Sequence, residues 1–369
     1  MKITIAQRLH PFSHTAGTKF LLPKSTFCVQ VFPTRLNFSD LEGKIEPFCL
    51  SFAFQGPIQE FTAELDLEHA LLRIFGKTLQ GYMRYLIYAA EGGIWIEVEK
   101  APKEGVTYSR CNTSLPFATG EKRQLCACPV YKVEGRAQEE RLSLGMHKLQ
   151  DWDLLRRRLD LKEIFPHLLR LAAWMPPLDL TDSADKAEGN YALLAVCRER
   201  IAQRQKQTMP QAFENLLLAA TEGVLVPRLR DTEYQGIVAE PADPAASISP
   251  LPLLLGAARC IRSLFYQESK EEIALLPCLP IPFHCGRMTN IQTRERHSIS
   301  LEWTKKCLRR VSIQPSAADE IVLKLPKGIK HFRLTQGRKM VKTMHVDAES
   351  KAVLPLDKDK TLYLDRFEY

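Results

Sequence analysis

Two polar stretches of the sequence combine residue types that could recognise a ligand. The first, Gln150–Arg158, reads Gln-Asp-Trp-Asp-Leu-Leu-Arg-Arg-Arg and places two carboxylates and three guanidinium groups around one tryptophan. Arginine forks bind carboxylate or phosphate through paired hydrogen bonds, and an indole is a residue type that stacks on sugars. Asp151, Trp152, Asp153 and Arg156 are therefore candidates for binding a glycan or an acidic ligand. An ordinary amphipathic helix explains the same pattern, with the tryptophan in the core and the aspartates near the positive N-terminal end.

The second polar stretch follows a segment with helical periodicity. Its candidate ligand-binding residues are Glu222, Arg230, Asp231, Tyr234 and Gln235. Polar loops on a helical scaffold often carry function. A plain surface turn explains the same residues, and both interpretations stay open at this stage.

The sequence lacks the motifs of several common kinds of functional site. There is no Gly-x-Gly-x-x-Gly phosphate loop and no His-Glu-x-x-His zinc motif. The ten cysteines are scattered without a Cys-x-x-Cys pair, which argues against a zinc or redox site. His284 and Cys285 are adjacent, and adjacent side chains on a strand point to opposite faces, so they are a poor nucleophile pair. We expect no cofactor and no metal.

The net charge of +8 is concentrated near the C-terminal end. The segment 287–345 has fourteen Lys or Arg and four Asp or Glu, a balance of 14 − 4 = +10. A basic surface that includes Lys305, Lys306, Arg309 and Arg310 could bind a nucleic acid or another polyanion. A solvated sheet face is the alternative.

The first third of the chain has β character. Lys2–Ile5, Phe27–Phe32 and Ile94–Val98 alternate or are rich in β-branched and aromatic residues, and Pro and Gly turns bound them. Glu64–Leu72 fits either a strand or a short helix. We predict an N-terminal β-sandwich domain over 1–145.

Helical and then β patterns follow. Over 146–270, apolar residues recur at helical spacing, and Pro166 is expected to end one helix or start the next. Further helices are expected from about 182 to 206, from Pro210 to Ala220, and from Leu253 to Phe265. Over 271–369 the alternation returns, with Ile299, Leu301 and Trp303 on one strand face. The predicted fold class is α+β: an N-terminal β-sandwich, a short helical middle region (a reduced α/α barrel) and a C-terminal β-sandwich.

Targeting and membrane signals are not apparent. The longest apolar runs are far shorter than the about 20 residues of a membrane helix, and the N-terminus lacks the apolar core of a secretory signal. We expect a cytoplasmic protein without membrane insertion.

One junction resembles a known family. Leu264–Ser269 reads Leu-Phe-Tyr-Gln-Glu-Ser, and Glu272–Pro280 reads Glu-Ile-Ala-Leu-Leu-Pro-Cys-Leu-Pro. These runs resemble the junction between barrel and C-terminal sandwich in family 95 glycoside hydrolases, the inverting α-L-fucosidases and their relatives. Trp303 resembles the tryptophan of a later strand in that family. The resemblance implies an N-terminal β-sandwich, an α/α barrel and a C-terminal β domain, in the order that the patterns predict.

The catalytic motif of that family is missing. The segment 146–270 is too short for the full helical barrel, and Pro252–Gly256 stands where the family has Asp-Gly-Asn-Phe-Gly. Proline cannot take a proton, so the resemblance implies that the aspartate's role in activating water is unfilled. Inversion needs two carboxyl groups about 6.5–9.5 Å apart. The acids in or beside the helical region are Asp151, Asp153, Glu214, Glu222, Asp231 and Glu233, and none matches a family motif.

Three functions remain as hypotheses. The leading one is a non-catalytic glycoside-hydrolase-like protein, a pseudoenzyme that binds carbohydrate or a protein partner. The second is an active glycoside hydrolase with a rebuilt carboxylate site. The third is a polyanion or nucleic-acid binder that acts through the basic C-terminal domain.

Overall fold

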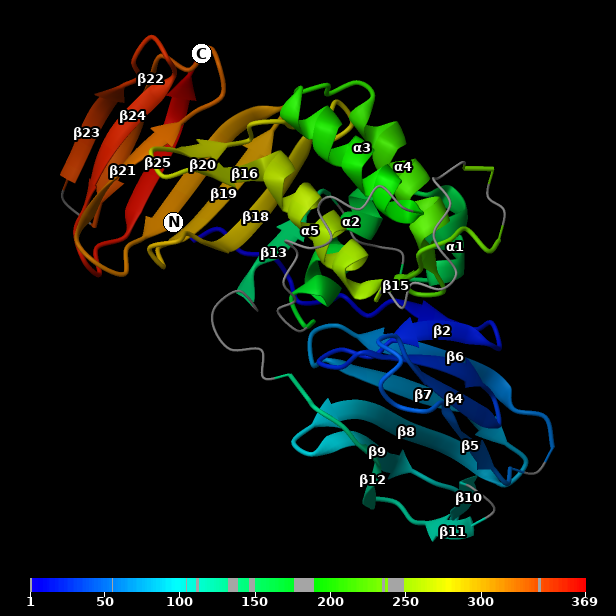
Figure 1. The fold of residues 1–369 in the computed structure, drawn as a ribbon. Coiled ribbons are helices and arrows are strands. Elements are labelled where there is room, and N and C mark those ends of the chain that lie inside the picture. The colour runs from blue at the N-terminus through cyan, green and yellow to red at the C-terminus, as the bar shows by residue number, and fades with distance from the viewer. Residues whose placement is uncertain are drawn as a thin grey trace.

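The chain folds into a block of strands, a block of helices and a second block of strands. The computed structural model describes residues 2–54, 56–103, 105–110, 113–131, 139–145, 150–175, 189–233, 236–237, 249–337 and 340–369. Figure 1 shows the helices between two sets of sheets, as the predicted α+β class requires. None of the helices in these ranges is long and apolar enough to cross a membrane.

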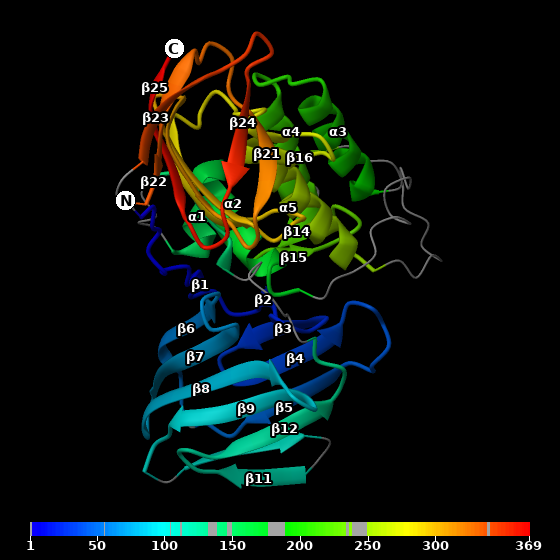
Figure 2. The same cartoon turned by 90° about the vertical axis from the view of Figure 1, so that its left-hand side faces the viewer.

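Two six-stranded antiparallel sheets face one another in the N-terminal block (Figure 2). In spatial order the first sheet contains β1 (Phe12–Ser13), β6 (Gln59–Asp66), β7 (Leu71–Thr78), β8 (Gly81–Ala90), β9 (Gly93–Lys100) and β12 (Lys122–Ala127). The second contains β11 (Thr113–Phe117), β10 (Val106–Arg110), β5 (Phe48–Phe52), β4 (Arg35–Asp40), β3 (Phe27–Phe32) and β2 (Thr18–Leu21). The predicted N-terminal β-sandwich is confirmed.

One local expectation in this block was wrong, and one open alternative is decided. Residues 2–5 form no strand, because antiparallel pairing with β6 is limited to Phe12 and Ser13 of β1. The segment 64–72 is not helical: it contains the end of β6, a turn and the start of β7. Its apolar residues alternate with polar ones at the strand period, which a short window cannot distinguish from a helix.

Five helices are described in the middle of the chain. They are α1 (Trp152–Arg158), α2 (Leu161–Ala172), α3 (Asn190–Ala202), α4 (Met209–Ala220) and α5 (Leu251–Phe265). Asp151 caps α1 by accepting the Leu154 amide at 3.1 Å, and basic residues occupy its last turn, where they favour the negative end of the helix. Pro166 lies inside α2, contrary to the prediction that it would mark a helix boundary.

The C-terminal block also has two layers. In spatial order the seven-stranded sheet contains β13 (Arg141–Ser143), β18 (Cys285–Gln292), β19 (Ser298–Thr304), β20 (Cys307–Gln314), β25 (Leu362–Glu368), β22 (His331–Gln336) and β23 (Met340–His345). The four-stranded sheet contains β16 (Tyr266–Glu268), β17 (Ile273–Leu275), β21 (Asp319–Lys324) and β24 (Lys351–Leu356). Between α4 and α5, β14 (Thr221–Glu222) and β15 (Val226–Pro227) form a small hairpin.

The two ends of the predicted N-terminal domain meet the C-terminal sheet. β13 pairs with β18, although residues 141–143 precede the helices in sequence. The chain start also lies beside this sheet, since Arg287 Nη1 donates to the Thr4 carbonyl at 3.3 Å. The first residues therefore run from the C-terminal sheet to the N-terminal sandwich, as Figure 1 shows.

Aromatic side chains join the helices to the C-terminal sheet. Trp303 is fully buried and stacks on Phe265 of α5 with 5.2 Å between ring centroids. Phe165 of α2 contacts Phe213 of α4 and Phe283, with 4.9 and 5.6 Å between centroids. The predicted core face of β19 is thus confirmed, and it continues into the helical core.

Candidate functional site

The two polar stretches singled out from the sequence lie side by side. The indole nitrogen of Trp152 donates to the carbonyl of Gly223, and Arg156 pairs with Glu233. Trp152 is only 3% exposed, so its ring faces the core and offers no stacking surface for a sugar. These contacts fix α1 against the turn between β14 and β15.

Most of the other residues of these stretches also connect α1 and the β14–β15 hairpin to neighbouring parts of the chain. Asp153 accepts from Ser13 and Thr15 of the N-terminal sandwich at 2.9 and 2.8 Å. Glu222 pairs with Lys19 at 2.8 Å, and Asp231 pairs with Arg228 at 3.1 Å.

Three candidates remain to be placed. Asp151 is the cap of α1, and Arg230 is exposed. Tyr234 and Gln235 lie outside the described residues.

Only part of the predicted basic surface is exposed without a compensating carboxylate among the described residues. Lys305 and Lys306 form the exposed turn between β19 and β20, and Arg309 is exposed beside them. Arg310, in contrast, pairs with Glu302 at 2.7 Å. The same carboxylate also pairs with Arg287 at 3.0 Å, so part of the positive charge of this sheet is compensated.

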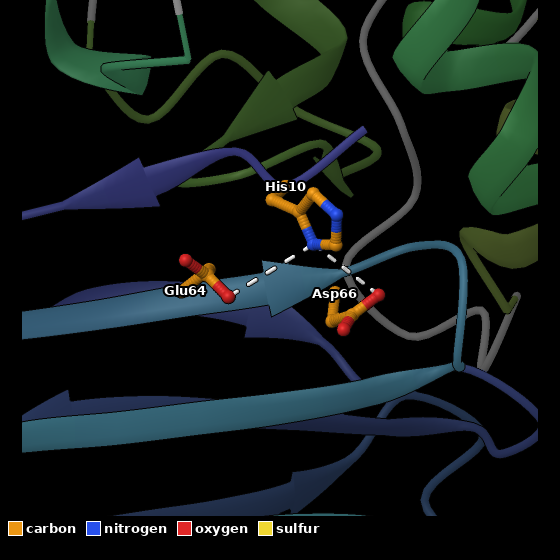
Figure 3. Close-up of side chains that lie close together, drawn as sticks. All are labelled: His10, Glu64 and Asp66. Carbon is orange, nitrogen blue, oxygen red and sulfur yellow. Dashed lines mark ion pairs between the residues drawn. The ribbon is translucent and has the colours of Figure 1, made fainter. Parts of the chain in front are cut away.

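A cluster of one histidine and two carboxylates lies where the chain start crosses β6. His10 Nδ1 is 3.3 Å from Asp66 and 3.9 Å from Glu64 (Figure 3). The three ligand-type atoms lie within 4.8 Å of one another. Arg73 of β7 pairs with Glu64 and, at 3.5 Å, with Asp66.

This His10–Glu64–Asp66 cluster suits ion pairing better than metal binding or acid catalysis. Burial alone would raise the pKa of Asp66, but hydrogen bonds from His10 and His69 lower it well below its ordinary value. The carboxyl is therefore ionised at neutral pH and cannot donate a proton to a leaving group. A divalent cation would also face the Arg73 guanidinium, which already occupies the same carboxylates.

Charge pairing continues from this cluster toward the C-terminal sheet. Glu68, two residues beyond Asp66, accepts the Leu9 amide at 3.2 Å and pairs with Arg141 of β13 at 2.5 Å. Arg170 of α2 lies 3.8 Å from the same carboxylate. Glu64 and Asp66 share one face of β6 at the strand period of two, a signal in the sequence that could have indicated this cluster.

The Arg141 end of this network opens into a cavity of about 490 Å³, here called the elbow cavity. It lies between the chain start and strands β13, β18 and β19. Its polar lining includes Arg8, Arg141, Arg287, Ser143 and Glu302, and its apolar lining includes Ile5, Leu9, Leu142 and Trp303. Glu302 is the only carboxylate among the described residues that line it.

Close packing of β13 against β18 shapes the wall of the elbow cavity. A Cβ atom added to Gly286 would lie 2.3 Å from the Trp303 ring and 2.7 Å from the Ser143 carbonyl. Only glycine fits this position. Sequence reasoning missed this site because its walls come from segments more than a hundred residues apart.

A second cavity, of about 540 Å³, lies between β16, β17 and β21 and is lined by several acids; we call it the acidic cavity. The hydrogen bond from Lys324 lowers the pKa of Glu272, and the one from His297 lowers the pKa of Asp319. Glu268 accepts the Tyr266 hydroxyl at 3.0 Å. These three carboxylates are thus engaged as acceptors or ion-pair partners.

A third cavity, of about 300 Å³, lies on the outer face of the first N-terminal sheet and is called the sheet cavity. It is lined by Glu64, Arg73, Phe75, Tyr82, Arg84 and Glu99. Neither the sheet cavity nor the two larger ones is lined by the predicted candidates of 150–158 and 222–235. The basic-surface candidates do not line them either.

Comparison with known proteins confirms the resemblance of the C-terminal part. Residues 267–364 match the family model described as the C-terminal domain of glycoside hydrolase family 95. The match includes β19 with Trp303 and begins just after α5. The C-terminal part of this chain is therefore glycoside-hydrolase-like.

More distant similarity was found among solved structures. A GH127 β-L-arabinofuranosidase from Geobacillus stearothermophilus T6 is 10% identical, with a TM-score of 0.21 over 55% of this chain and 31% of that chain. A structure described as a glycoside hydrolase is 13% identical, with a TM-score of 0.22 over 56% and 32%. The chain thus covers about a third of each of these structures. A search of curated proteins found no match.

Proposed function

We propose that this chain is a non-catalytic, glycoside-hydrolase-like protein that binds carbohydrate in the elbow cavity. The observation that carries the proposal is the polar lining of that cavity, which among the described residues includes three arginines and a single carboxylate. Glycoside hydrolysis requires two carboxyl groups, one to protonate the leaving oxygen and one to activate water or attack the sugar. Binding requires only donors and acceptors at the correct spacing, which guanidinium groups and Glu302 provide.

The ion pairs of Glu302 also support a role in binding. Its carboxylate is shared between Arg287 and Arg310 at 3.0 and 2.7 Å. A carboxylate that accepts from two guanidinium groups is held in place as a hydrogen-bond acceptor, which suits the binding of sugar hydroxyls.

Other acids in the described residues fit hydrolysis no better. Burial raises the pKa of Glu163 and of Glu214, as a general acid requires, but neither lines the elbow, acidic or sheet cavity. In the acidic cavity, Glu272 and Asp319 have lowered pKa values. Pro252, at the start of α5, supports the same conclusion through the family resemblance.

Two assays test this function. Thermal-shift screening against neutral monosaccharides and uronic acids should give a shift in Tm, larger for uronic acids because the exposed Arg8 adds positive charge beside the Arg141–Glu68 and Arg287–Glu302 pairs. Arg287→Ala should abolish the shift, whereas Arg294→Ala, an exposed arginine outside the elbow cavity, should preserve it. Incubation with aryl glycosides should release no phenol above background. Enzymatic turnover, or a shift that Arg287→Ala leaves intact, would refute the proposal.

A further inference from the structure

The outer face of the first N-terminal sheet differs in chemistry from that of the second. Its strands alternate buried residues with aromatic and charged ones, and no described helix or strand lies in front of β7, β8 and β9 in Figure 2. On the second sheet, the partly exposed positions of β3 and β4 include Gln30 and Asn37, which bond to each other at 3.2 Å. The outer face of the first sheet is thus distinguished by its aromatic and charged residues.

Aromatic residues on this face form two groups. Phe75 of β7 and Tyr82 of β8 have ring centroids 6.5 Å apart and line the sheet cavity. Tyr88 of β8 is the register partner of Trp95 of β9. Tyr82 and Tyr88 are six residues apart on one strand, which places the two groups about 20 Å from each other.

Most charged residues on this face are paired, whereas Lys100 of β9 lies over the Tyr82 ring, 5.9 Å from its centroid. Arg73 pairs with Glu64, Arg84 with Glu99 at 2.5 Å, and Lys122 with Glu97 at 3.0 Å. Each pair presents hydrogen-bond donors and acceptors together, while the positive and negative charges cancel. The pairing leaves this face with little net charge, so it has little electrostatic preference for a charged ligand.

From this arrangement we infer that the outer face of the β6–β7–β8–β9 layer is a binding surface for an extended neutral oligosaccharide. The C–H face of a sugar ring is weakly positive and suits the negative face of an aromatic ring. Vicinal hydroxyls both donate and accept, as the Arg–Glu pairs do. Two aromatic groups about 20 Å apart match a chain of several sugar rings rather than a single one.

This surface is separate from the elbow cavity, so the inference does not rest on the proposed function. Its ligand is neutral and extended, whereas the elbow cavity has an excess of arginine. The two can therefore succeed or fail independently.

Affinity gel electrophoresis tests the inference. The intact chain is run through gels that contain a neutral galactan, xylan, mannan or mixed-linkage glucan, with polygalacturonate as the anionic comparison. We expect retardation by at least one neutral polymer, and about tenfold weaker affinity after Tyr82→Ala or Trp95→Ala. Tyr82→Phe, which keeps the ring, should retain most of the affinity.

The chain offers a matched control. Leu115 on the second sheet is 38% exposed, close to the 37% of Tyr82, so Leu115→Ala removes a comparable apolar surface elsewhere. Arg287→Ala tests the elbow cavity in the same gels. Far-ultraviolet circular dichroism confirms that each variant is folded. No retardation by any neutral polymer, retardation by polygalacturonate alone, or affinity unchanged by both aromatic substitutions would overturn the inference.

Discussion

The indole nitrogen of Trp152 donates a hydrogen bond to the carbonyl of Gly223, which connects the first helix to a turn seventy-one residues later. The amide of the next residue, Val224, donates to the Lys19 carbonyl at 2.8 Å. The turn between β14 and β15 is therefore held on one side by α1 and on the other by the N-terminal sandwich. This turn is a packed contact between the helical block and the N-terminal sandwich. Its polar residues form hydrogen bonds and ion pairs across that contact, and the sequence alone cannot distinguish such residues from ligand-binding ones.

Replacing Gly223 with alanine should destabilise this turn. Gly223 has φ +48°, and a Cβ atom there would lie 2.2 Å from the Lys19 carbonyl oxygen. Backbone must move to relieve that contact, so we expect a loss of about 2–4 kcal/mol in the free energy of unfolding, measured with urea. Gly337→Ala is the control, because Gly337 has φ +60° with nothing within 4 Å of an added Cβ. Equal losses for the two variants would show that the close contact has no cost.

The sequence predicted the elements better than the sites, for a physical reason. Local periodicity determines which residues of β3, β9 and α5 are buried, and these elements appeared where expected. The elbow cavity depends on segments around residues 5, 142, 287 and 302, which only the tertiary fold brings together. Trp152 shows the converse: its local setting suggested a ligand, but the fold places it in the core.

The contact between His10 and Asp66 should make stability depend on pH. The hydrogen bond to Asp66 raises the pKa of His10 above 6.5, with smaller contributions from Glu64 and Glu68. The stabilisation is thus complete below about pH 6.5 and is lost as pH rises through the folded-state pKa. Asp66, with its lowered pKa, contributes above its unfolded value of 3.8 and loses this contribution as pH falls through the folded-state pKa.

Unfolding midpoints in urea at pH 5, 7 and 9 measure this effect. The wild type should lose stability from pH 5 to pH 9, and His10→Gln should remove the part of that loss due to His10. His331→Gln is the control, since His331 pairs with Glu368 at 3.1 Å at the edge of a different sheet. If the pH profiles of His10→Gln and wild type are parallel, the contact does not stabilise the fold.

Glu302 should be more important for stability than an exposed acid. It is buried between Arg287 and Arg310, so Glu302→Gln leaves two guanidinium groups without their shared counter-ion. Both arginines are partly exposed, and solvent screening limits the expected loss to about 1–2 kcal/mol. Glu349→Gln, at an acid whose side chain is 70% exposed and pairs with Lys351, should cost less than about 0.5 kcal/mol. Urea unfolding compares the two, and a loss for Glu302→Gln no greater than that for Glu349→Gln would contradict the expectation.

Polyanion binding through the basic C-terminal surface should be weak. Within the described residues Lys305, Lys306 and Arg309 have no ion-pair partner, whereas Arg310 is compensated by Glu302. Three free cations correspond to a slope of about −3 when the logarithm of the binding constant is plotted against the logarithm of salt concentration. Titration of heparin at several salt concentrations measures that slope. Lys305→Glu with Lys306→Glu should abolish the interaction, whereas Arg310→Gln should change it little. A much steeper slope, or equal effects of these variants, would mean that polyanions bind through other parts of the chain.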